Sequence, residues 1–137
     1  MNLLSVGFTL IELLVVILII SILSTISFTI YQHYEGKAIL TQYGTVFGKN
    51  CMDEVITYCM ENPNGIIDEN VAPECNTSQR ADQYTFNISK DNGQCSGPEP
   101  PDNYTVTITC DQIPKLKFVC TYRTATHGYT CTVELND

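Results

Sequence analysis

The sequence predicts an α+β fold, in which one long N-terminal α-helix packs on a C-terminal four-stranded antiparallel β-sheet. Three observations predict it. An apolar segment opens the chain and continues as an amphipathic helical pattern, four runs of alternating apolar and polar residues fill the second half, and the 137 residues include seven cysteines. A chain of this length holds one modest domain besides an anchor, and disulfides would stabilise the small core of that domain.

The apolar segment runs from Phe8 to Tyr31 and contains no Lys, Arg, Gly or Pro. As a helix it would be about 36 Å long, which is enough to cross a hydrocarbon layer roughly 30 Å thick. Its only charged residue is Glu12. A carboxylate in such a segment costs roughly 2–3 kcal/mol unless another group neutralises it. Glu12 is therefore a candidate functional residue.

The helical pattern continues to Glu61, and Asn62-Pro63-Asn64-Gly65 is expected to end it. Gly36 is the expected bend between the apolar and amphipathic halves. Gly44 and Gly48 lie one turn apart, which predicts the close approach of a neighbouring strand or subunit. Apolar residues at steps of three and four predict one buried stripe, made of Ile39, Leu40, Tyr43, Val46, Phe47, Cys51, Val55 and Cys59.

The second half of the chain reads as a sheet after a polar connecting loop, Ile66 to Gln83, that contains Cys75. Period-two alternation with one polar face predicts antiparallel strands, with the apolar face on the helix stripe and the polar face in solvent. The connections between the runs fit a meander. The four expected strands cover residues 84–89, 104–110, 116–122 and 129–135.

Residues 7–14, Gly-Phe-Thr-Leu-Ile-Glu-Leu-Leu, closely resemble the N-terminal signature of type IV pilins. In that family a prepilin peptidase cuts after the Gly and methylates the new N-terminal Phe, and the Glu pairs with the N-terminal amine of a neighbouring subunit. The resemblance implies cleavage between Gly7 and Phe8, N-methylation of Phe8 and an assembly role for Glu12. Two unlike charges that meet only between packed subunits offset each other's desolvation, whereas a wrong register leaves both unpaired.

The resemblance also implies a domain organisation and a function. Residues 1–7 would be a leader peptide, residues 8–35 a transmembrane and filament-core helix, and residues 36–137 a globular pilin head. The chain would be a structural subunit, the major pilin of a type IV pilus, which serves adhesion, twitching motility or DNA uptake. Its partners would be copies of itself in a helical filament, the bacterial inner membrane before assembly, the prepilin peptidase and the pilus assembly machinery.

The cysteines predict a disulfide framework in an oxidising compartment. Because their number is odd, at least one thiol is free or bonds to another chain. The favoured pairs are Cys59 with Cys75 and Cys120 with Cys131, although sequence alone leaves the connectivity open. In the resembling family a disulfide commonly closes a C-terminal loop, which suits the second pair. The disulfide candidates are Cys51, Cys59, Cys75, Cys95, Cys110, Cys120 and Cys131.

Composition weighs against several other functions. The formal net charge is −8, with seven Lys and Arg against fifteen Asp and Glu, which opposes direct binding of nucleic acid. No catalytic constellation, metal centre or cofactor site is expected, because the sequence has no C-x₂-C pair and His33 and His127 lie far apart. Asn76 and Asn103 begin N-x-[ST] matches in expected loops and are candidate glycosylation sites.

Two alternatives stay open at this point. A minor pilin or a type II secretion pseudopilin resembles a pilin, and pseudopilin heads can hold calcium, for which the acidic pair Asp68-Glu69 in a loop would be suited. The alternative of another class is a membrane-anchored secreted binding domain, which would remain monomeric and would not need Glu12.

Overall fold

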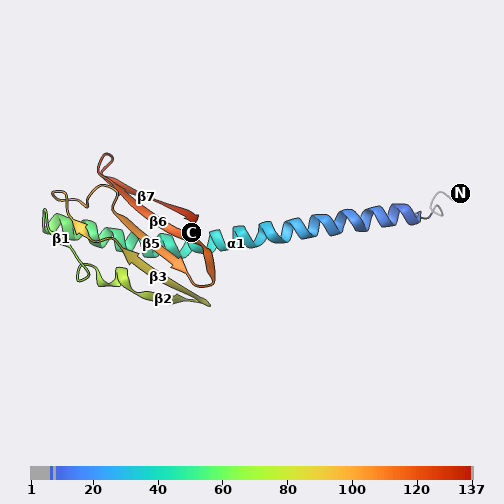
Figure 1. Ribbon diagram of the computed structural model, residues 1–137, viewed down its shortest axis with the longest axis horizontal. Coiled ribbons are helices and arrows are strands. Elements are labelled where there is room, and N and C mark those ends of the chain that lie inside the picture. Colours follow the sequence, from blue (N-terminus) through green and yellow to red (C-terminus); the bar gives the residue numbers. More distant parts are fainter. Residues whose placement is uncertain (1–6, 8, 137) are drawn as a thin grey trace. The chain divides into compact units, whose positions relative to one another are not determined.

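The computed structural model describes Gly7 and residues 9–136 (Figure 1). The expected leader up to residue 6 and the expected methylation at Phe8 therefore fall outside the described residues. The chain divides into two compact units, Met1–Glu35 and Gly36–Asp137, and one helix contributes to both.

Helix α1 spans Leu10–Glu61. In its first part hydroxyl side chains bond back to the preceding turn, as Ser21 Oγ donates to the carbonyl oxygen of Ile17 at 2.7 Å. Helix α1 is continuous through Gly36, where the sequence predicts a bend. A Cβ at Gly36 would lie 3.1 Å from Cγ2 of Ile113, so the glycine serves close packing on the sheet. The helix ends ahead of Pro63, as expected.

The second unit contains a five-stranded antiparallel sheet whose strands follow the order β2-β3-β5-β6-β7 (Figure 1). The α+β prediction is confirmed. The expected number of four strands is wrong because β2 adds an edge strand from Ser-Gln-Arg-Ala, a segment without apolar alternation. The five strands are β2 (Ser78–Ala81), β3 (Tyr84–Lys90), β5 (Thr105–Cys110), β6 (Ile113–Arg123) and β7 (Gly128–Leu135).

The segment from 66 to 83 has more structure than the expected connecting loop. Besides β2 it contains strand β1 (Ile66–Ile67), which pairs with β4 (Gly93–Gln94) in a separate two-stranded sheet. It also contains a 3₁₀ helix, η2 (Pro73–Asn76), whose Cys75 is buried. These elements are too short to produce a periodic signal in the sequence.

The core of the second unit lies between one face of the sheet and the part of α1 that follows Gly36. A Cβ at Gly44 would lie 2.6 Å from Cγ of Phe118, and one at Gly48 would lie 2.8 Å from Sγ of Cys120. The two glycines therefore let β6 approach the helix backbone, which agrees with the expected close approach of a strand. The buried helix residues are Gly36, Leu40, Gly44, Gly48, Cys51, Met52, Val55 and Cys59.

Two residues expected in the core lie at the surface instead. Val46 is 55% exposed because it points away from the stripe through Gly44 and Gly48. Leu135 is 67% exposed because it lies at the end of β7, the edge strand of the sheet. Periodicity along the chain therefore does not reveal where the buried face of an element ends.

Three disulfides cross the second unit: Cys51–Cys75, Cys59–Cys95 and Cys120–Cys131. The expected pairing of Cys59 with Cys75 is wrong. Two helical turns separate Cys51 from Cys59 on the same buried stripe, so either could meet Cys75, and the path of the loop decides between them. The last bridge is the pairing that the sequence analysis favoured.

Cys110 is a disulfide candidate that forms no bridge, and its thiol is buried in β5. Its Sγ lies 3.4 Å from Oε1 of Gln112. The odd cysteine of the sequence is therefore a core residue within the part of the chain that the structure describes.

Candidate functional site

Two reciprocal hydrogen bonds between Thr9 and Glu12 define the start of α1. The backbone N–H of Thr9 donates to Oε2 of Glu12 at 3.0 Å, and the backbone N–H of Glu12 donates to Oγ1 of Thr9 at 3.2 Å. This is a capping box, in which two residues three apart satisfy each other's unpaired backbone donors. The positive end of the helix macrodipole further favours a carboxylate at this position. The local sequence thus gives Glu12 a defined position.

The helix that follows Glu12 presents apolar side chains around its whole circumference. Leu10 is 82% exposed, and every described side chain from there to Glu35 is also exposed. By length and composition α1 contains a stretch apolar enough to cross a membrane. Such a surface is stable only against lipid or against another apolar surface.

Glu12 has a hydrogen-bond donor but no counter-charge within the described chain, in which the only ion pair joins His127 and Glu99. An ionised carboxylate has two oxygens and about four acceptor positions. One capping bond leaves the carboxylate able to accept hydrogen bonds from an ammonium group. Glu12 can therefore bind a cation that comes from another molecule while it still caps its own helix.

Residues 7–28 match the family described as the prokaryotic N-terminal methylation motif. The chain carries the class III signal peptide of type IV pilin-like proteins. This motif implies processing by a prepilin peptidase and a pilus-assembly context, and it points to a structural protein. It also fits a membrane-anchored precursor. Neither the curated proteins nor the solved structures contain a significant match to the chain.

Gly7, the expected cleavage position, is exposed and precedes the helix that begins at Leu10, whereas Phe8 lies outside the described residues. The candidate glycosylation sites Asn76 and Asn103 are both exposed. Asn103 has a positive φ of 61°, and its Oδ1 accepts a hydrogen bond from the guanidinium of Arg123. Nothing else in the structure distinguishes these asparagines as modification sites.

The acidic loop considered for calcium has a different geometry. Oδ1 of Asp68 accepts a hydrogen bond from the backbone N–H of Asn70 at 2.9 Å, and the carbonyl oxygen of Asp68 accepts one from Nζ of Lys90 at 2.6 Å. The ammonium group of Lys90 thus lies against the backbone of this loop. Over residues 7 and 9–136 there is no group of three or more His, Cys, Asp or Glu placed to hold a metal ion.

His127 belongs to a polar cluster that ties the β6–β7 turn to the preceding loop. Its Nδ1 lies 2.8 Å from Oε2 of Glu99, and the same oxygen accepts a hydrogen bond from the hydroxyl of Tyr122 at 2.8 Å. The hydrogen bonds from His127 and Tyr122 lower the pKa of Glu99. Burial and the bond to Glu99 raise the pKa of Tyr122 to about 12. The cluster is structural, with every member bonded to another.

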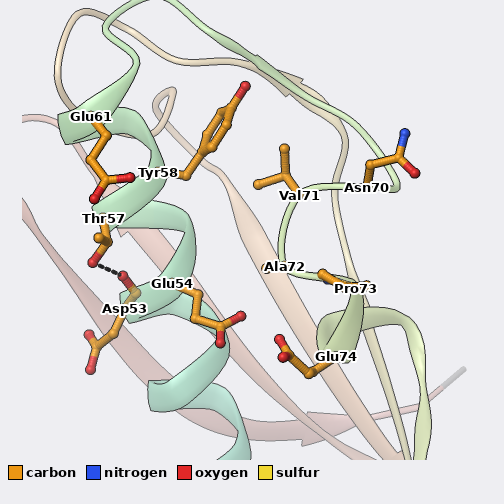
Figure 2. A pocket seen from close by; sticks show the side chains of 10 residues that line it. All are labelled: Asp53, Glu54, Thr57, Tyr58, Glu61, Asn70, Val71, Ala72, Pro73 and Glu74. Atoms are coloured by element: carbon orange, nitrogen blue, oxygen red, sulfur yellow. Dashed lines mark hydrogen bonds between the residues drawn. The ribbon is translucent and has the colours of Figure 1, made fainter.

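Sequence reasoning missed one pair of facing acidic side chains in the second unit. Glu54 on α1 and Glu74 on η2 face each other beside a hollow of about 520 Å³ (Figure 2). Hydrogen bonding to Glu74 and burial raise the pKa of Glu54. The Asp53-Glu54 pair reads as solvated surface in the sequence, and only the Cys51–Cys75 bridge brings Glu74 to it.

Proposed function

We propose that this chain is the major pilin of a type IV pilus, a structural subunit that polymerises through its N-terminal helix into an extracellular filament. The observation that carries the proposal is the exposed apolar surface of α1, which contains a single capped carboxylate, Glu12, near its start. In the membrane this surface is covered by lipid. Once the protein leaves the membrane, copies of the same helix are the surfaces best suited to cover it.

Assembly of this kind is a head-to-tail contact that does not close into a ring and so extends into a filament. In the proposal, a prepilin peptidase cuts between Gly7 and Phe8 and methylates Phe8, whose amine then pairs with Glu12 of a neighbouring subunit. The capping box survives this cleavage because the N–H of Thr9 belongs to the Phe8–Thr9 peptide bond. Glu12 is thus held at the helix start before and after processing.

The remaining residues, 36–137, form the proposed head of the subunit at the filament surface. Three disulfides and a small apolar core suit an oxidising environment outside the inner membrane. The acidic balance of the chain opposes direct contact with DNA. The head would therefore contribute to adhesion or motility, and DNA uptake would depend on another protein of the pilus.

The test is to replace Glu12 by Gln in the producing organism and to measure sheared surface fibres, membrane-bound precursor and intact mass. A Gln side chain at this position still accepts the N–H of Thr9, so the capping box persists while the charge is lost. We expect a strong reduction in fibres with normal precursor. Leu14→Ile, an uncharged change two residues after Glu12, is the matched control and should leave the fibre yield unchanged.

An undiminished fibre yield with Glu12→Gln would contradict the assembly role of the charge. A wild-type protein that stays monomeric, retains residues 1–7 and forms no fibres would favour the membrane-anchored binding domain. Fibres in which this chain is a scarce component would favour a minor pilin or a pseudopilin.

A further inference from the structure

Strand β7 (Gly128–Leu135) is one edge of the five-stranded sheet, and it is the less protected of the two edges (Figure 1). The other edge strand, β2, has only four residues and carries the charged Arg80. Short length, charges, prolines and bulges are the usual means by which proteins protect a sheet edge from another strand. β7 has eight residues, pairs with β6 without a register shift, contains no proline and has Glu134 as its single charged residue. Its edge is therefore able to accept a further strand.

Two contacts establish which backbone groups of β7 point to the open edge. The N–H of Asn136, which directly follows β7, donates to the carbonyl oxygen of Lys115 at 2.9 Å, so the alternate residues before it also bond to β6. Cys120 and Cys131 lie opposite each other with Cα atoms 4.0 Å apart, the close spacing typical of a pair that exchanges no backbone hydrogen bonds. In the described chain no backbone hydrogen bond outside the ladder with β6 reaches the residues that point to the open edge. These residues are Tyr129, Cys131, Val133 and Leu135.

The two faces of this edge differ in their side chains. On the face toward α1, the hydroxyl of Tyr129 donates to Oδ1 of Asp53 at 3.1 Å, whereas Leu135 is 67% exposed. The apolar face of the sheet thus ends at this edge in an uncovered leucine. The side chains exposed on the solvent face are those of Thr130, Thr132 and Glu134.

We propose that β7 pairs with β7 of a second copy of this chain in an antiparallel ladder, with Thr132 opposite Thr132 of the second copy. In this register Tyr129 lies opposite Leu135 of the second copy, and Cys131 lies opposite Val133. Every outward N–H and C=O group of these four residues then has a partner, because they meet as hydrogen-bonded pairs. A shift by two residues in either direction leaves one outward residue of each copy unpaired. The edge is therefore self-complementary in one register.

The side chains fit the same register, which identifies the occupant as a second copy. The exposed Leu135 gains an aromatic neighbour in Tyr129 of the second copy, and cross-strand pairs of this kind stabilise a sheet. Glu134 lies opposite Thr130 of the second copy, so no like charges face each other directly. The two Thr132 side chains meet at the twofold axis, where their hydroxyl groups can bond to each other.

This pairing differs in symmetry from the contact that would build a fibre. It is isologous, because both copies contribute the same surface, and it closes after two molecules. Subunits of one fibre are related by a heterologous, head-to-tail contact. The β7 pairing would therefore join separate molecules or separate fibres, and it does not depend on the proposed filament.

Cross-linking of the full-length protein in detergent micelles tests the pairing. Thr132→Cys places two thiols directly opposite each other at the twofold axis, and mild oxidation should yield disulfide-linked dimers on a non-reducing gel. Thr130→Cys is the matched control, because it changes the same residue type on the same face of β7. In the proposed register its two copies lie four residues apart along the ladder, or about 14 Å, which is too far for a disulfide. We expect severalfold more dimer with Thr132→Cys than with Thr130→Cys.

A second set of variants tests the register away from the axis. A mixture of the Thr130→Cys and Glu134→Cys proteins should form a mixed disulfide, identified by peptide mapping, whereas neither protein should form dimers alone. A monomeric Thr132→Cys protein, equal dimer yields from Thr132→Cys and Thr130→Cys, or the absence of the mixed disulfide would each overturn the proposal. No fibres enter this measurement, so its failure is distinct from a failure of the proposed function.

Discussion

Thr9 and Glu12 bond to each other in both directions at the start of α1, at 3.0 and 3.2 Å. Glu12 therefore has a structural role that is independent of any neighbouring molecule. The same carboxylate is free to receive a cation because a cap uses only part of its acceptor capacity. This double role means that a loss of charge and a loss of capping at Glu12 must be measured separately.

Thr9→Ala weakens the capping of α1 while it leaves the charge of Glu12 in place. It removes the hydroxyl that accepts the N–H of Glu12 and keeps the Glu12 carboxylate. We expect the first turn of α1 to lose about 1 kcal/mol of stability, which is typical for loss of a cap. Its amides should exchange faster in detergent micelles, while fibre yield falls less than with Glu12→Gln. Thr9→Ser retains a hydroxyl and should behave like the wild type.

Gly44→Ala should destabilise the second unit. The new Cβ would lie 2.6 Å from Cγ of Phe118, so either β6 or the aromatic ring must move. Overpacking of this kind typically costs about 1–3 kcal/mol and should lower the midpoint of denaturant unfolding. Gly93→Ala is the matched control, because a Cβ there would meet its nearest neighbour at an ordinary 3.6 Å. Equal midpoints for both variants would show that helix and strand approach less closely than described.

Peptide mapping under non-reducing conditions should recover Cys51 with Cys75, Cys59 with Cys95, and Cys120 with Cys131. A thiol reagent should modify Cys110 only after unfolding, since this thiol is buried. Replacing Cys59 and Cys95 together by Ser should lower the free energy of unfolding by about 2–4 kcal/mol. Replacing Cys110 by Ala should cost less, because no cross-link is lost. Recovery of a Cys59–Cys75 peptide would contradict the described path of the loop.

The cluster around Glu99 predicts a loss of stability in acid. Hydrogen bonds from His127 and Tyr122 lower the pKa of Glu99 in the folded protein. The contribution of Glu99 to the free energy of unfolding is therefore present above the ordinary pKa of Glu. It is lost as the pH falls through the lowered pKa of Glu99. Thermal unfolding followed from about pH 6 down to pH 3 should show a smaller decline for Glu99→Gln than for the wild type. If the thermal stability of Glu99→Gln fell with pH as much as that of the wild type, Glu99 would make no such contribution.

Some elements of the fold could be predicted from the sequence alone, and others could not. The helix end at Glu61 and the strands β3, β5, β6 and β7 follow from Pro63 and from period-two alternation, because these signals are local. The edge strand β2 was missed since its four residues pair with β3 through backbone groups and have no apolar pattern. The residue type of Gly36 could not reveal its close packing on Ile113, because glycine serves both bends and close packing.

The order of residues by itself determined the apolar helix with its lone carboxylate, the methylation motif over residues 7–28 and the α+β class, since each depends on composition or spacing along the chain. Tertiary structure alone decided which cysteines meet, and with them which acidic side chains face each other. Cys51 and Cys59 are equivalent in helical period, and only the course of the folded loop brings Cys75 to the first. That one bridge brings Glu74 to the same hollow as Glu54, and no local pattern encodes the proximity of two residues so far apart in sequence.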